Sequence, residues 1–297
     1  ESSDAFAALA GQLYEGAQLN LLSVEVKSTE AENGLVRQIL FPELFVLEPD
    51  FLIDITALCA CIKPYGHSPY TYFLSKFSPS PRSAAIQMGN AANQFLDDCV
   101  NEPESEADTD EETLYLRSIR RSFRHDPLAW STLPDIDRDF FDRCRQQFHH
   151  IRENVRHHFG IARIDTKHAQ VQLEPAFLCE ALGLQGRMDL LAGNGEKLIE
   201  LKSGKADEYP VRTPKYEHQM QMALYKETLH YGMGLSRDEV QSFLFYSRYP
   251  QCYAIDMPRE DIRRAIALRN AILHLERRLR NGESRQIVDE LCEEQIN

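Results

Sequence analysis

The 297-residue sequence lacks the features that mark a membrane or secreted protein. It has no uninterrupted apolar run close to the roughly 20 residues that a membrane helix needs. Its first residues, Glu1 to Asp4, do not begin a basic segment that leads into an apolar one. The seven cysteines are odd in number and scattered, which is typical of reduced thiols and not of a disulfide framework. We therefore expect a cytoplasmic protein that does not enter a membrane.

Positive charge is also scarce. Lys and Arg number 33 against 46 Asp and Glu, and this net charge of -13 counts against a nucleic-acid partner, because phosphate binding normally needs a basic surface. Part of the acidic excess is local, since acidic side chains crowd residues 102–112, which we interpret as a solvated, flexible loop. The remaining surface can still carry a basic groove. No Gly-x-x-x-x-Gly-Lys-Ser/Thr motif is present, so we expect no ATPase site in this chain.

The residues that are present alternate with periods typical of both helices and strands. We predict helices over residues 3–22, 83–100 after a Ser83 cap, 112–124, 135–158, from Thr213-Pro214 onward and over 259–280, and strands over 38–47, 51–55, from 168 onward and over 241–249. Strands joined by a crossover helix are typical of an α/β core. We therefore predict one domain over residues 1–297, with a mostly helical segment at 82–165 and an α/β core at 166–257.

A hairpin in the core brings two carboxylates together. Its two apolar segments flank Asn194-Gly195, the dipeptide that favours a two-residue type I′ turn. Counting outward from that loop places Asp189 directly opposite Glu200. Directly opposed side chains lie roughly 5 Å apart at Cβ, so two carboxylates there repel each other unless a proton or a cation lies between them. The sequence therefore predicts a divalent metal ion between Asp189 and Glu200.

Lys202 adds a cation to the same face of the strand, because it lies two residues after Glu200. A carboxylate-bound Mg²⁺ or Mn²⁺ beside an ammonium suits phosphodiester hydrolysis, in which water is activated and transition-state charge is neutralised. The alternative is an exposed hairpin whose Glu and Lys are ordinary solvated residues. The opposed Asp189, together with the apolar Leu190, Ile199 and Leu201 on the other face, favours the metal site.

A second candidate element follows in the predicted helix. Helical spacing puts His218, Gln221, Met222 and Tyr225 on one stripe. Core packing alone would explain Met222 and Tyr225, but it explains His218 and Gln221 poorly.

These motifs together resemble a known family. Gly-Arg-Met-Asp at residues 186–189 and Glu-Leu-Lys-Ser-Gly-Lys at 200–205 resemble the motifs of the PD-(D/E)XK nucleases, and Gln221 to Tyr225 resembles the Gln-x-x-x-Tyr motif of their RecB-type branch. The likeness is closest to the nuclease domain of the eukaryotic replication and repair helicase-nucleases that trim Okazaki-fragment flaps, and to bacterial relatives of that domain. Glu174, residues 183–186 and the later motifs fall in its order and spacing, and residues 49–61 and 89–93 look like its entry segment and first helix.

The resemblance implies a restriction-endonuclease-like fold, with a mixed central sheet flanked by helices. It also implies a metal-dependent deoxyribonuclease that acts on single-stranded or flap DNA, with a helicase domain or subunit as partner. The implied catalytic residues are Asp189, Glu200, Lys202, Gln221 and Tyr225, and the implied metal ligands are Asp189, Glu200, Leu201, Asn93 and Glu174. A DNA path lined by basic and aromatic side chains would use Arg187, Lys205, Arg212, Lys215, Tyr216 and His218. Apart from His218, each of these could equally be an ordinary surface or packing residue.

The chain departs from the family in two ways. Relatives usually carry a metal-binding histidine on the first helix, where this chain has Asn93, which could instead cap or pack locally. Many relatives also hold an iron–sulfur cluster with three clustered downstream cysteines, but only Cys252 and Cys292 follow the nuclease motifs here. We therefore expect no cluster, and we interpret Cys59 and Cys61 as small buried hydrophobes.

Two functions remain open at this point. The intact Asp189, Glu200 and Lys202 favour a nuclease. Asn93 and the acidic composition favour the alternative, a DNA-binding or scaffolding module of a helicase-nuclease assembly that cleaves weakly or not at all.

Overall fold

The computed structural model describes residues 9–32, 35–63, 66–79, 81–102, 109–208 and 210–294. In these residues, five strands form a mixed sheet in the order β12-β11-β10-β9-β6. The strands are β6 (Val171–Leu173), β9 (Leu190–Ala192), β10 (Lys197–Lys202), β11 (Gln241–Tyr246) and β12 (Gln251–Ile255). The central strands β10 and β11 are parallel, because α8 (Tyr216–Met233) crosses between them, and the other pairs are antiparallel. The predicted mixed α/β fold is confirmed.

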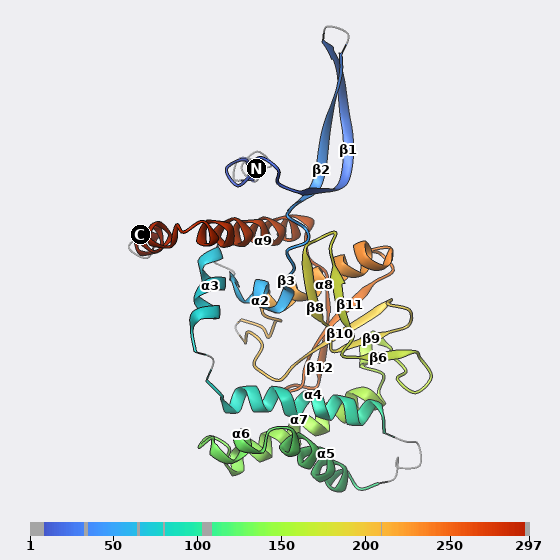
Figure 1. The fold of residues 1–297 in the computed structure, drawn as a ribbon. Helices are drawn as coiled ribbons and strands as arrows, with labels where there is room; N and C mark the ends of the chain where they lie inside the picture. Colours follow the sequence, from blue (N-terminus) through green and yellow to red (C-terminus); the bar gives the residue numbers. More distant parts are fainter. Residues whose placement is uncertain are drawn as a thin grey trace.

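The sheet separates two apolar cores, because side chains of a strand alternate between its faces. Leu198 of β10 packs into the core that contains α2 (Ile55–Ala60), α8 and α9 (Arg259–Arg280). Ile199 and Leu201 pack into the other core, with α4 (Ala84–Val100), α5 (Glu111–His125) and α7 (Arg138–Arg156). Figure 1 shows these two groups of helices on opposite sides of the sheet.

The helical block begins where polar caps predict it. The Ser83 side chain accepts from the Ile86 amide at 3.3 Å and starts α4, which confirms the predicted helix. Asp137 caps α7 in the same way, so α7 begins at Arg138 and not at Asp135 as predicted. The short helices α3 (Pro69–Phe77), α6 (Pro127–Thr132) and α10 (Ser284–Glu294) were not assigned bounds from the sequence. The 3-10 turn η2 (Gly160–Ala162) links the block to the core.

A second sheet joins distant parts of the chain. β3 (Ile53–Asp54) pairs in parallel with β8 (Leu184–Arg187), which pairs antiparallel with β7 (Ala176–Cys179). The predicted strand at residues 51–55 is wrong at its end, because the Asp54 side chain accepts from the Ala57 amide and starts α2 at Ile55. A small ladder of β4 (Ile62–Lys63) and β5 (Gly66–His67) follows.

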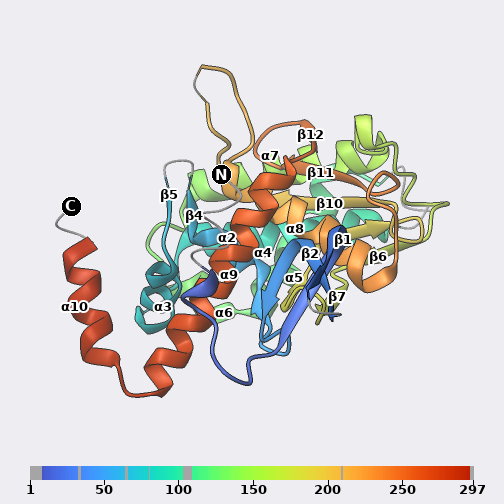
Figure 2. The same ribbon diagram turned by 90° about the horizontal axis from the view of Figure 1, so that it is seen from above.

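A long hairpin of β1 (Leu19–Glu32) and β2 (Leu35–Leu47) projects from the body (Figure 1) and lies beside α9 in the view from above (Figure 2). The helix predicted over residues 3–22 is wrong at Leu19–Leu22, which pair with Leu44–Leu47; residues 1–8 lie outside the described residues. Strand pairing outweighs local helical periodicity there. Arg269 of α9, fully buried, anchors the base of the hairpin by donating to the carbonyl groups of Leu47 and Glu48.

Two other expectations can be placed. Of the predicted acidic loop, residues 103–108 lie outside the described residues. Cys59 and Cys61 are each 3% exposed, which confirms their interpretation as buried residues. Among the described residues, no helix combines the length and the apolar character of a membrane span.

Candidate active site

Strand β10 carries the predicted carboxylate and lysine on one face. The β9–β10 ladder pairs Lys197 with Ala192 and Ile199 with Leu190, so the next position outward sets Glu200 against Asp189. The predicted register is confirmed. The predicted type I′ turn is wrong, because that turn needs a positive φ at Asn194 and only Gly195 has one there.

Asp189 occupies the point at which the chain passes from one sheet to the other. β8 ends at Arg187 in the three-stranded sheet, and β9 begins at Leu190 in the central sheet. The Asp189 Oδ2 atom accepts from the Leu201 amide at 2.7 Å. This hydrogen bond fixes the carboxylate against the end of β10, beside Glu200.

Gln221 of α8 connects the carboxylate to the lysine. Lys202 Nζ donates to Glu200 Oε1 at 2.8 Å and to Gln221 Oε1 at 2.9 Å, and Gln221 Nε2 donates back to Glu200 Oε1 at 2.9 Å. The same amide nitrogen lies 2.7 Å from the Tyr225 hydroxyl and 3.2 Å from Thr56 Oγ1 of α2. The Tyr225 hydroxyl donates to the Arg187 carbonyl at 2.8 Å, next to Asp189. The two residues of the Gln-x-x-x-Tyr spacing therefore hold both sides of the site.

The site encloses two carboxyl groups, those of Asp189 and Glu200, and only one ammonium group, that of Lys202. Burial, and then the charge of Glu200, raises the pKa of the Asp189 carboxyl well above its ordinary value. Burial lowers the pKa of Lys202, but Glu200 and Asp189 outweigh it and raise that pKa overall. Glu200 Oε2 is buried and has no hydrogen-bond partner among the described residues. A buried oxygen without a partner beside a second carboxylate fits a cation.

The protein ligands for such a cation are few. In the part of the chain that the structure describes, no three His, Cys, Asp or Glu side chains are arranged to hold a metal ion. Asp189 and Glu200 supply two carboxylates, and the carbonyl of Leu201, the residue after Glu200, is a further candidate ligand. Mg²⁺ is commonly held by one or two carboxylates and keeps several waters, so this donor set fits it.

Of the two other predicted metal ligands, Glu174 lies beside Asp189, and Asn93 lies on α4. The Glu174 amide donates to the Asp189 carbonyl at 3.0 Å, and its carboxylate accepts from Arg187 at 3.2 Å. Asn93 is half-buried on α4, between Gly89 and Asp97 at one-turn intervals. A Cβ at Gly89 would lie 3.6 Å from Ser203 Oγ, just after Lys202. Asp97 has its pKa raised to about 6 by burial and then by Glu174.

Sequence reasoning missed several residues that support the site. Asp97 could have been found from its spacing of four after Asn93 on a helix. Thr56 carries no such signal, because α2 meets α8 only in the folded chain. Gln147 of α7 donates to the Ser203 carbonyl at 3.2 Å and accepts from Ser247, whose amide donates to the Lys202 carbonyl at 3.0 Å. This pair fixes the backbone at the end of β10.

The predicted DNA-binding residues divide into two groups. Arg187 and Lys205 are exposed beside the site, and the exposed Arg212 stacks on Tyr249 with its guanidinium carbon 3.8 Å from the ring centre. His218 Nδ1 lies 2.7 Å from the Tyr246 hydroxyl, and burial, followed by the charge of Lys202, lowers its pKa to about 4. His218 is therefore neutral at pH 7. The Lys215 amide donates to the same Tyr246 hydroxyl at 3.0 Å.

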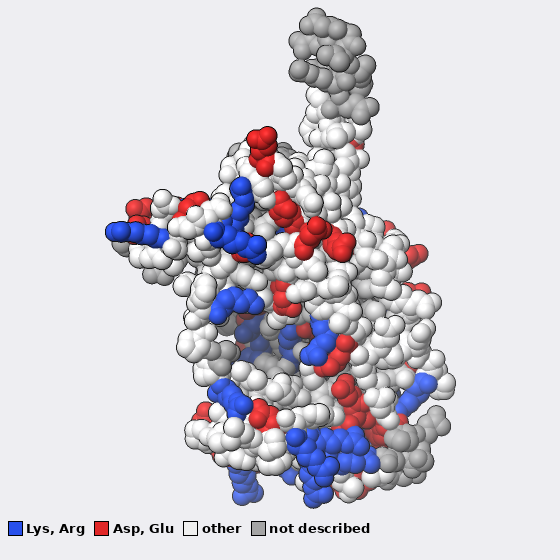
Figure 3. Space-filling model, viewed as in Figure 1, with Lys and Arg blue, Asp and Glu red and all other residues white. Residues whose placement is uncertain are grey.

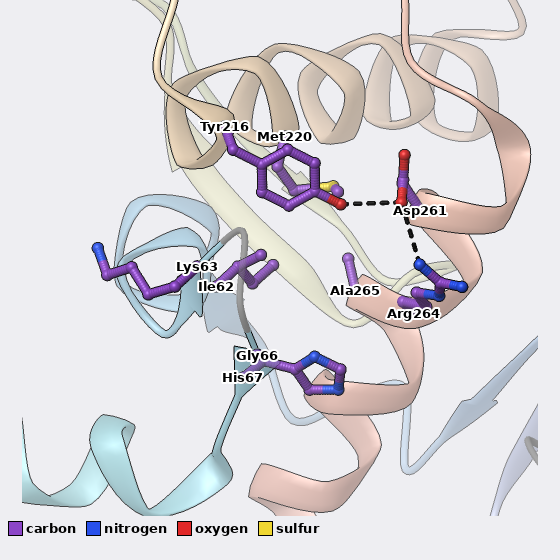
Figure 4. A pocket seen from close by; sticks show the side chains of 9 residues that line it. All are labelled: Ile62, Lys63, Gly66, His67, Tyr216, Met220, Asp261, Arg264 and Ala265. Atoms are coloured by element: carbon purple, nitrogen blue, oxygen red, sulfur yellow. Dashed lines mark hydrogen bonds and ion pairs between the residues drawn. The ribbon is translucent and has the colours of Figure 1, made fainter. Parts of the chain in front are cut away.

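Tyr216 belongs to a different surface. It lies on the opposite side of α8 from Gln221, and its hydroxyl donates to Asp261 at 2.8 Å. It lines a pocket of about 250 Å³ together with Lys63, Met220 and Arg264, among others (Figure 4). The structure does not bring Tyr216 to the carboxylate site.

The fold and the site define a restriction-endonuclease-like protein: a mixed sheet whose central strand presents Glu-x-Lys beside an opposed Asp. The family model of the PD-(D/E)XK nuclease superfamily matches residues 61–294, and the chain belongs to this superfamily, whose members are generally metal-dependent nucleases. No match to the chain is found among curated proteins.

Proposed function

We propose that this protein is a divalent-metal-dependent deoxyribonuclease that hydrolyses phosphodiester bonds in single-stranded or flap DNA. The observation that carries the proposal is the state of Glu200: one carboxylate oxygen is held by Lys202 and Gln221, and the other is buried without a partner among the described residues. The enclosed Asp189 lies opposite Glu200, one position beyond the last pair of the β9–β10 ladder. Family membership supports a nucleic acid as the substrate.

Each residue of the site would have a distinct role. Asp189, Glu200 and the Leu201 carbonyl would hold Mg²⁺ or Mn²⁺, with Glu174 and Asn93 as further candidate ligands. The bound ion would supply Lewis-acid stabilisation and would lower the pKa of water. Lys202 would place its ammonium beside the scissile phosphate, where negative charge develops. Gln221 and Tyr225 would act as positioning residues, because they fix Glu200, Lys202 and the Arg187 carbonyl.

The proposal extends to the setting of the enzyme. We place the chain in the RecB-type branch on the spacing of Gln221 and Tyr225, as one domain with a helical segment at 82–165 and a catalytic core at 166–257. A helicase domain or subunit would be its partner and the cytoplasm its location. Because too few cysteines follow Tyr225, the purified protein should lack the visible absorption of an iron–sulfur cluster. A brown preparation with stoichiometric iron would contradict this.

A gel assay on end-labelled single-stranded, flap and duplex DNA tests the activity. Cleavage should require Mg²⁺ or Mn²⁺ and should stop in EDTA. Glu200→Gln and Asp189→Asn should each lower the rate by on the order of a thousandfold or more, because a metal ligand contributes several kcal/mol to the transition state. Both variants should keep the fold, because Gln and Asn match the size of the carboxylates that they replace. Cleavage by either variant at the wild-type rate would sink the assignment.

The second candidate function is a DNA-binding or scaffolding module with little cleavage. Asn93 in place of the family histidine and the net charge of -13 favour it. Under this alternative, wild-type protein would bind the same DNA with or without metal but would not cut it at any Mn²⁺ concentration.

A further inference from the structure

Helix α5 concentrates positive charge on one face. Arg120 and Arg121 each lie three or four residues from both Arg117 and Arg124, which places the four on a single stripe of the helix. All four are exposed, whereas Tyr115, Ile119 and Ser122 on the other side are buried. We call these four residues the α5 arginine stripe. Figure 3 shows Lys and Arg side chains gathered over α5, at the lower edge of the molecule.

The stripe is unusual for a chain whose net charge is -13. Cations three and four residues apart on a helix repel one another. Arg121 is offset by Asp98 of α4, with which it forms an ion pair. Within the described residues, Arg120 and Arg124 have no ion-pair partner. This repulsion raises the free energy of the folded state, and a bound polyanion would relieve it.

The position of the stripe connects it to the active site. Asp98, the partner of Arg121, lies on α4, and a Cβ at Gly89 of the same helix would lie 3.6 Å from Ser203 Oγ, one residue after Lys202. The stripe thus lies one helix away from the end of β10, the strand that carries Glu200 and Lys202. Two exposed apolar side chains flank it: Leu116 is 38% exposed and Phe123 is 43% exposed. Cations beside an exposed aromatic ring suit a single strand, whose phosphates pair with Arg and whose bases stack on rings.

We propose that the α5 arginine stripe binds the phosphate backbone of the substrate strand beyond the cleavage site. The proposal rests on the proposed nuclease function and deepens it, because it names a surface that tracks the strand after it leaves the Asp189–Glu200 centre. An acidic polypeptide is the competing ligand for such a surface. The flanking Phe123 favours the nucleic acid, since acidic peptides offer no bases to stack.

The test measures binding of fluorescent oligothymidylates by anisotropy in EDTA, with the full chain. One probe of about 6 nucleotides fills little more than the site, and one of about 30 nucleotides reaches beyond it. The variant is Arg120→Gln with Arg124→Gln. The matched control is Arg263→Gln with Arg280→Gln on α9, which removes the same charge at the opposite end of the molecule (Figure 1).

The stripe variant should bind the long probe about 25-fold more weakly at about 0.1 M salt, with a salt slope smaller by about 1.4, because each lost phosphate contact to a single strand contributes about 0.7. Its affinity for the short probe should match wild type, and its unfolding temperature should be equal or higher, because the substitutions relieve the repulsion within the stripe. All values of the control should match wild type. Equal loss on both probes, or equal loss in the control, would make the effect one of overall charge and would overturn the proposal. A stripe variant that keeps its DNA binding but loses binding to polyglutamate would also overturn the proposal.

The same measurements separate this proposal from the proposed function. If the wild-type protein binds the long probe through the stripe but never cuts it, the nuclease assignment is wrong and the stripe proposal is retained. If cutting depends on metal but the stripe variant and wild type bind the long probe equally well, only the stripe proposal is wrong.

Discussion

The Lys202 ammonium donates to Glu200 Oε1 at 2.8 Å, and the second oxygen of that carboxylate is left buried without a partner among the described residues. Both residues lie on the face of β10 that α8 covers, and Gln221 bonds to each of them. The lysine is therefore held in a fixed position with or without substrate. A cation held in place costs no reorganisation when negative charge develops next to it.

Lys202→Met should lower kcat by on the order of 100-fold to 1000-fold while leaving DNA affinity within about twofold, since a cation aimed at the scissile phosphate acts mainly on the transition state. Single-turnover cleavage at saturating metal, with Kd from anisotropy, checks this. Lys205→Met is the matched control: Lys205 is exposed in the following loop, so its loss should affect affinity and not the rate at saturating DNA. A Lys202 variant that binds weakly but cuts at the full rate would place Lys202 in the binding path instead.

The metal-free protein should lose stability as the pH rises, because the pKa of Asp189 is raised in the folded state by burial and by Glu200. Folded Asp189 keeps its proton above about pH 4, where the unfolded chain has lost it, so the free energy of unfolding falls until the folded pKa is passed and is then constant. Asp189→Asn should remove this slope. Adding Mg²⁺ should reverse it for wild type, because metal binding requires the ionised carboxylate.

Urea unfolding in EDTA from about pH 5 to about pH 8 measures the effect. Comparison of wild type with Asp189→Asn isolates Asp189 from His218, whose pKa is lowered to about 4 and whose contribution has the opposite sign. His218 favours the folded state above its ordinary pKa, and that contribution is lost as the pH falls toward about 4. Parallel curves for the two proteins would show that Asp189 is not protonated preferentially in the folded state.

The sequence predicted the local parts of this structure better than the long-range ones. Caps and periodicity placed α4 and α9, and counting from the Asn194-Gly195 loop placed Asp189 against Glu200, because these features depend on neighbouring residues. The start of β1, Leu19–Leu22, was predicted as helix, because its pairing with β2 cannot be inferred from a local pattern. Thr56 and Gln147 reach the site only through packing between elements far apart in sequence, and no motif marks them. The Asn194-Gly195 turn was found but its type was wrong.

Gly183→Ala should destabilise the protein severely. Gly183 has φ +61°, and a Cβ there would overlap the guanidinium of Arg269, which donates to the Gly183 carbonyl and to those of Leu47, Glu48 and Phe51. Displacement of a buried Arg leaves several carbonyl groups without a donor, at about 1–3 kcal/mol each, beyond a strain of about 1–2 kcal/mol for the left-handed backbone. We expect a loss of about 3 kcal/mol or more and a Tm lower by about 6–12 °C.

Gly234→Ala is the matched control for this prediction. Gly234 has φ +73° at the end of α8, but no atom lies within 4 Å of its built Cβ, so the substitution adds only backbone strain. Its unfolding midpoint should fall by about a third as much or less. Equal losses in the two variants would mean that Arg269 can move aside at no cost.

Asn93→His should tighten Mn²⁺ binding and raise cleavage at low metal concentration. Asn93 lies four residues after Gly89 and four before Asp97. A Cβ at Gly89 would contact Ser203, the residue after Lys202, and burial, followed by the charge of Glu174, raises the pKa of Asp97. Residues four apart share a helix face, so Asn93 should point toward the same centre. An amide oxygen is a hard, neutral ligand that suits Mg²⁺, whereas imidazole suits Mn²⁺ and later transition metals better. The histidine should therefore gain about tenfold in Mn²⁺ affinity, which is about 1.4 kcal/mol, with a smaller change for Mg²⁺.

Asn90→His provides the control for Asn93→His, because Asn90 lies three residues earlier on the same helix and is exposed, whereas Asn93 is half-buried. Calorimetric titration with Mn²⁺ gives the affinity of each protein, and cleavage rates over a range of Mn²⁺ concentrations give the functional consequence. If Asn93 only packs locally, the Mn²⁺ curves of wild type and both variants will coincide. A gain shared by both variants would indicate that an added histidine anywhere on this helix recruits metal, and Asn93 would lose its place at the site. A gain in Mn²⁺ affinity confined to Asn93→His would show that the face of α4 that carries Asn93 borders the metal centre. Only a side chain within coordinating distance can change the affinity for one ion more than for another.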